Sequence, residues 1–118
     1  KSAIELGLAE HEYNALCTTL YMMEDGQIKP ELIFMQTFKE ITNCGTAHCI
    51  AGWANEMDKK AFPEVTDNIP YTSSKLHQRL PLELSKLFGI EYSKMSRATP
   101  VVAISALRTY LETGICPV

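Results

Sequence analysis

Hydrophobic residues recur at helical spacing in the first part of the chain. Between Ala9 and Glu24, apolar side chains follow the i, i+3, i+4, i+7 pattern that collects them on one face of a helix. Asp25 and Gly26 come directly afterwards, and glycine is the usual residue where a helix ends in the left-handed conformation. The pattern predicts an amphipathic helix over residues 9–24.

A second apolar run follows Pro30. Proline is favoured at the first position of a helix, where its missing amide hydrogen would have no helical partner. We therefore expect a short helix from Pro30 to about Glu40. The apolar residues available for its buried side are Leu32, Ile33, Phe34, Met35 and Phe38.

Two helices are predicted in the last third of the chain. Pro81 can open a short one that ends near Phe88. Thr99 is a suitable N-cap for a longer helix, Pro100 would occupy its first position, and Gly114 would end it. The stretch from Pro63 to Ser74, rich in Pro, Thr, Asp, Asn and Ser, is expected to be an irregular connection.

The middle of the chain predicts a helix that is apolar almost all round. Thr46 is a candidate N-cap, and the run from Ala47 to Asp58 contains Trp53, the largest apolar group available for a core. Helices without a polar face are usually buried. We expect an all-α fold: a compact single-domain bundle, residues 1–118, of about five helices around a buried central helix over residues 46–58.

Composition agrees with one globular domain. The 118 residues are 46% hydrophobic and 21% charged, which is ordinary usage for a folded protein. No apolar run approaches the roughly 20 residues needed to span a bilayer, and two glutamates stand among the first ten residues. We expect a cytoplasmic protein, bacterial or in a host cell, without membrane association.

Charge is unevenly distributed along the chain. The net charge is −3, but residues 1–70 carry five Lys/Arg against eleven Asp/Glu, whereas residues 71–118 carry six against three. Lys94, Arg97 and Arg108 are therefore candidate binding residues. Binding of nucleic acid is disfavoured, because these cations are spaced singly and few aromatic residues stand between them.

The segment that contains Cys44, His48 and Cys49 could carry chemistry. Thiolate and imidazole are zinc ligands, but the second ligand pair of a usual zinc site is missing from the sequence. A thiol near a helix start can be reactive, with His48 or His11 as its base, yet no orienting acid can be named. We favour a structural role for the segment and expect no metal and no cofactor.

The same segment, Cys44-Gly45-Thr46-Ala47-His48-Cys49-Ile50-Ala51-Gly52-Trp53-Ala54, resembles a family of small uncharacterised bacterial and bacteriophage proteins with a Cys-Gly-Thr-x-x-Cys-x-x-Gly-Trp-Ala pattern. Further matching stretches are Leu20 to Gly26, Phe34-Met35, Leu87-Phe88 and Ala98 to Gly114. The resemblance implies a phage or prophage setting and no particular activity.

Function is expected to lie in binding and not in catalysis. No Gly-rich phosphate loop, nucleophile elbow or zinc-protease motif occurs. We expect a non-enzymatic interaction or regulatory factor, with a host or defence protein as its partner. The alternative is a small metal- or thiol-dependent enzyme or sensor centred on Cys44, His48 and Cys49; the oligomeric state stays open.

Overall fold

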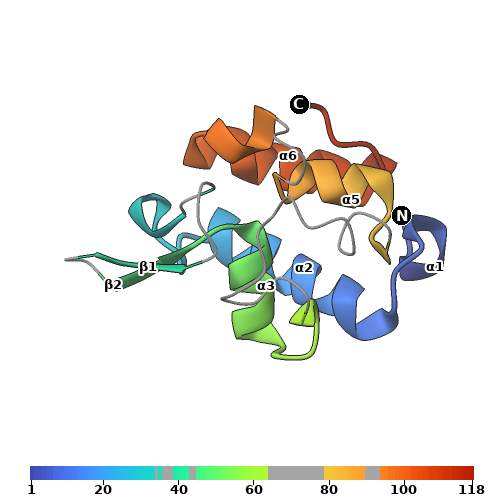
Figure 1. The fold of residues 1–118 in the computed structure, drawn as a ribbon, viewed down its shortest axis with the longest axis horizontal. Helices are drawn as coiled ribbons and strands as arrows, with labels where there is room; N and C mark the ends of the chain where they lie inside the picture. The colour runs from blue at the N-terminus through green and yellow to red at the C-terminus, as the bar shows by residue number, and fades with distance from the viewer. Residues whose placement is uncertain (34, 36–38, 43–44, 64–78, 90–93) are drawn as a thin grey trace.

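The structure is a computed structural model that describes residues 1–33, 35, 39–42, 45–63, 79–89 and 94–118 (Figure 1). The α-helices in these ranges are α1 (Ala3–Leu6), α2 (Glu10–Glu24), α3 (Ile50–Met57), α5 (Leu82–Leu87) and α6 (Pro100–Thr113). Two 3-10 turns, η1 (Pro30–Leu32) and η4 (Lys94–Arg97), and one hairpin, β1 (Lys39–Thr42) and β2 (Gly45–His48), accompany them. The molecule measures 37 × 29 × 26 Å.

The helices enclose one core between two groups. Figure 1 shows α5 and α6 on one side and α2 and α3 on the other, with the hairpin projecting at one end. Phe62, just after α3, meets Phe88, at the end of α5, edge to face with ring centroids 4.9 Å apart. Both rings are buried, so this aromatic contact joins the two groups of helices. The predicted all-α class and single compact domain are confirmed, with the hairpin as an addition.

Three predicted helices begin and end close to their sequence signals. α2 covers the predicted stretch, and Gly26 after it has a positive φ of 81°. α5 occupies the expected position, with Pro81 as its N-cap. For α6, the Thr99 hydroxyl accepts a hydrogen bond from the amide of Val102, and Gly114 ends the helix at φ 79°. These ends agree because capping depends on neighbouring residues only.

The predicted helix from Pro30 to Glu40 is wrong. Pro30 starts only the 3-10 turn η1, and Ile33 then has extended backbone and forms a parallel bridge with His48. Lys39–Thr42 is the strand β1. Pairing of β1 with the strand that follows it in the sequence, and of Ile33 with His48, outweighed the helix signal here. Of the expected buried residues, Ile33 and Met35 are buried and Leu32 is half-buried, whereas Phe34 and Phe38 lie outside the described residues.

The predicted start of the central helix at Thr46 is also wrong. Residues 45–48 form β2, antiparallel to β1 in a register that places Ile41 opposite Thr46. β-Branched residues such as these favour extended backbone. The helix α3 starts four residues later, at Ile50, with Cys49 as its N-cap. It is buried along most of its length, as expected, and packs mainly on α2.

Trp53 is not the fully buried centre that the sequence suggested. It is half-buried at the edge of the core, and its indole Nε1 donates a hydrogen bond of 2.9 Å to the carbonyl of Leu32. The largest fully buried side chains among the described residues are Tyr110, Phe62 and Phe88. Trp53 therefore ties η1 to α3 and does not fill the middle of the domain.

A helix that the sequence reading missed opens the chain. Ser2 and Glu5 form a reciprocal capping box around α1, and Gly7 ends it at φ 71°. With four residues, α1 is too short to show hydrophobic periodicity. The buried Glu12 carboxylate then accepts a hydrogen bond from the Ala9 amide at 2.9 Å, which caps the start of α2.

The chain leaves α3 through a turn held by one buried side chain. The Asn55 amide donates to the carbonyl of Phe62 at 3.0 Å, and its oxygen accepts from the Phe62 amide at 2.8 Å. The two bonds position Phe62 in the core. The connection predicted to be irregular falls mostly on residues 64–78, outside the described part. None of the described helices has the length and apolar character to cross a bilayer.

Candidate functional site

Cys49 has a structural position in the described fold. Its side chain is fully buried, and its sulfur accepts a hydrogen bond from the amide of Gly52 at 3.5 Å, as the N-cap of α3. The expectation that it would lie inside the first turn of the helix is therefore wrong, because the helix starts later. A thiol with no exposed surface cannot meet a substrate without a structural opening.

His48 joins the hairpin to α3. It is 3% exposed and packs edge to face on Trp53, with ring centroids 4.7 Å apart at an angle of 72°. Its Nε2 lies 3.8 Å from the carboxylate of Glu56, which also binds the Lys59 ammonium at 2.9 Å. These contacts give the imidazole a packing role between two elements.

Among the described residues, no group of three or more His, Cys, Asp or Glu side chains is arranged to hold a metal ion. Cys44 lies outside those residues, so the predicted group of Cys44, His48 and Cys49 cannot be placed as a whole. Its two described members make the structural contacts given above. The metal- or thiol-centred alternative gains no support from them.

The three predicted basic residues have different surroundings. Arg108, on α6, donates from Nε to Glu24 of α2 at 2.7 Å and from Nη1 to Glu112 at 2.9 Å. The hydrogen bonds with Glu24 and Glu112 raise the pKa of the Arg108 guanidinium. Arg108 therefore clamps α6 to α2 on the surface, and its charge is already compensated within the fold.

Lys94 and Arg97 stand at the two ends of η4 and are both exposed. Within the part of the chain that the structure describes, neither has a carboxylate within ion-pair distance. Only Ala98 and Thr99 separate η4 from the first residue of α6. The structure thus keeps two of the predicted cations together beside the start of one helix and assigns the third to a different role.

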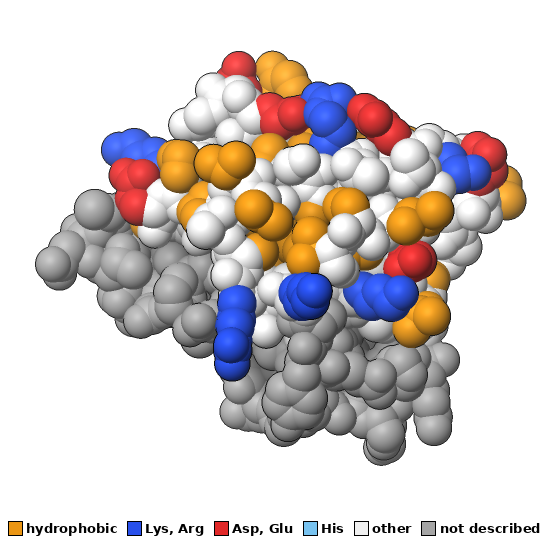
Figure 2. Space-filling view, turned by 90° about the horizontal axis from the view of Figure 1, so that it is seen from above, with side chains coloured by type: hydrophobic (Ala, Val, Ile, Leu, Met, Phe, Trp, Pro, Cys, Tyr) orange, Lys and Arg blue, Asp and Glu red, His pale blue; other side chains and the backbone are white. Residues whose placement is uncertain are grey.

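Apolar side chains beside these cations were missed from the sequence. Val101 is 76% exposed and Val102 is 39% exposed, both in the first turn of α6, while Ala103, Ala106 and Leu107 face the core. Figure 2 shows this side of the molecule, with apolar side chains across the middle of the described surface and Lys and Arg along one edge of that surface. At the opposite margin, basic and acidic side chains alternate.

We call Lys94, Arg97, Val101, Val102 and Ser105 the η4–α6 face. Ser105 is exposed one turn after Val101, and Arg108 is exposed one turn further along the same side of α6. On a helix whose core positions are 103, 106, 107 and 110, valines at positions 101 and 102 cannot both point inward. These core positions are known only from the structure, so the exposure of the two valines could not be predicted from the sequence.

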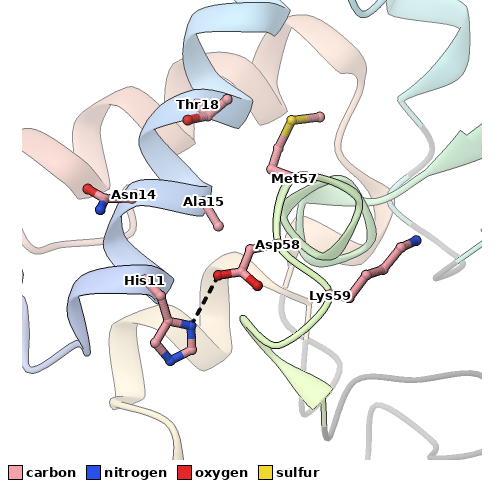
Figure 3. A pocket seen from close by; sticks show the side chains of 7 residues that line it. All are labelled: His11, Asn14, Ala15, Thr18, Met57, Asp58 and Lys59. Atoms are coloured by element: carbon pink, nitrogen blue, oxygen red, sulfur yellow. Dashed lines mark ion pairs between the residues drawn. The ribbon is translucent and has the colours of Figure 1, made fainter.

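A shallow pocket of about 500 Å³ between α2 and the end of α3 is a second candidate. His11 Nδ1 lies 3.4 Å from Asp58 Oδ2 across it (Figure 3). Figure 3 shows the side chains of Asn14 and Thr18 directed away from this pair. Binding sites usually have a few polar groups that converge on one point. Because these groups diverge, we assign His11 and Asp58 to an exposed contact between α2 and α3.

Comparison of the chain with protein-family models, with curated proteins and with solved structures gave no match. The resemblance to the bacterial and bacteriophage family therefore stays a sequence-based prediction.

Proposed function

We propose that the protein is a non-enzymatic interaction or regulatory factor that binds a partner protein through the η4–α6 face. The observation that carries the proposal is the exposure of two adjacent valines, Val101 and Val102, at the start of a helix whose other side is buried. Apolar surface rimmed by polar residues is typical of protein interaction sites. A host or defence protein as the partner follows from the resemblance stated above.

Site-directed photo-cross-linking in bacterial cells that produce the protein tests the proposal. A photoreactive residue at position 101 should give an adduct with one defined polypeptide. The matched control is position 4, because Ile4 is 90% exposed and also apolar. α1 lies beside Gly114 at the far end of α6, a separation of about 20 Å for a 14-residue helix.

The adduct should form at position 101 and not at position 4. Val102→Asp, a charge placed inside the face, should abolish it, whereas Ile4→Asp should leave it unchanged. Adducts of equal yield at both positions would mean that the η4–α6 face has no preferred partner. An absence of adducts at position 101 would contradict the proposal.

A further inference from the structure

We infer that the partner segment that occupies the η4–α6 face is an acidic amphipathic helix; this inference rests on the proposed function. Its apolar side would cover Val101 and Val102, and its glutamates or aspartates would pair with Lys94 and Arg97. A helix laid along a partly apolar surface is a common mode of peptide recognition. Charge complementarity at the rim of an interface favours a partner of opposite charge, here a negative one.

Several cations of the described chain are already compensated within the fold. Five cations elsewhere in the described chain have a carboxylate within 4.0 Å: Lys1, Lys59, Arg79, Lys86 and Arg108. Lys94 and Arg97, like Lys29 and Lys60, are exposed and have no such carboxylate among the described residues, but only Lys94 and Arg97 share one turn. The two cations stand three residues apart on one 3-10 turn, so a single acidic segment can reach both.

The start of α6 adds to the positive potential of this face. α6 is 14 residues long, and a helix carries a partial positive charge at its N-terminus. Thr99 satisfies only one of the first amides, that of Val102. Acidic side chains of a partner would therefore be attracted by two full charges and by the helix end together.

Protein fits the face better than nucleic acid. Duplex binding relies on many Lys and Arg contacts to phosphates, whereas the η4–α6 face holds two cations and the whole chain has a net charge of −3. The exposed valines would gain nothing against a phosphate backbone. They would lose contact with water against the apolar side of an amphipathic helix.

Fluorescence anisotropy with a designed peptide tests the inference. The probe is a labelled helical peptide with leucine at i, i+3, i+4 and i+7 and glutamate at the flanking positions; a second peptide has lysine at those positions. The wild-type protein should bind the glutamate peptide at least about tenfold more tightly than the lysine peptide. The double variant Lys94→Glu/Arg97→Glu should reverse this preference.

Lys60→Glu is the matched control, since Lys60 is exposed and follows α3, which lies on the other side of the core from α6 (Figure 1). It should leave both affinities within about twofold of wild type. Equal binding of the two peptides, no binding of the glutamate peptide, or tighter binding of a DNA duplex would each overturn the inference.

The same double variant separates this inference from the proposed function. In the protein that carries the photoreactive residue at position 101, Lys94→Glu/Arg97→Glu should remove the adduct. An adduct that persists in the double variant would refute the acidic partner and leave the interaction face intact. If no adduct forms at position 101 even when Lys94 and Arg97 are present, the proposed interaction through the η4–α6 face is itself refuted.

Discussion

Replacement of Tyr110 by phenylalanine should stabilise the protein. The side chain of Tyr110 is 1% exposed, and its hydroxyl oxygen is buried without a hydrogen-bond partner among the described residues. A buried polar group without a partner costs about 1–3 kcal/mol. The void left by one oxygen atom costs about 0.3 kcal/mol at the usual cavity coefficient. We therefore expect the free energy of unfolding to rise by about 1 kcal/mol.

Urea unfolding and thermal unfolding, both followed by circular dichroism, measure this difference. The control is Tyr21→Phe, because Tyr21 is 64% exposed and its hydroxyl is in contact with water. The control should not change the unfolding midpoint, whereas Tyr110→Phe should raise the melting temperature by about 4 °C. A Tyr110→Phe variant less stable than wild type would show that the hydroxyl has a partner and that the packing around α6 is different.

The pH dependence provides an independent measurement on the same group. Burial, followed by the negative charges of Glu12 and Glu83, raises the pKa of Tyr110 from 10.0 to about 12. Between these two values the unfolded chain loses the phenolic proton while the folded protein keeps it. The stability contributed by Tyr110 is therefore complete below pH 10 and is lost as pH rises toward 12. Tyr110→Phe should lack this part of the alkaline destabilisation.

Three further substitutions test other parts of the fold. Asn55→Ala should lower the free energy of unfolding by about 2–4 kcal/mol, because it leaves the buried amide and carbonyl of Phe62 unpaired; an unchanged denaturation midpoint would contradict the two hydrogen bonds. Trp53→Phe should cost about 1 kcal/mol, the value of the lost indole hydrogen bond, and a loss above about 3 kcal/mol would instead indicate a fully buried ring. Glu24→Gln should weaken the clamp made with Arg108, so that the difference from wild type in thermal unfolding is present at low salt and shrinks at high salt; a salt-independent difference would argue against an ionic clamp.

The candidate site was only partly readable from the sequence. Lys94 and Arg97 could be named as binding residues from charge alone, and the structure places both in one short turn beside α6. Arg108 could not be separated from them, because its partner Glu24 is 84 residues away in the sequence. His48 and Cys49 looked like candidate ligands because of their chemistry, yet burial against Trp53 and hydrogen bonding to Gly52 give them structural roles.

The sequence by itself determined α2, α5 and α6 and the all-α class. These helices follow from apolar periodicity over several turns and from caps such as Thr99 and Gly114, which act within a few residues. Only the tertiary structure decided the path between Pro30 and Cys49, where the bridge of Ile33 with His48 and the pairing of β1 with β2 replaced an expected helix. Strand pairing depends on cross-strand partners, such as His48 for Ile33, and not on the propensity of one segment alone. The exposure of the valines of the η4–α6 face likewise depends on which side of α6 packs on the rest of the fold.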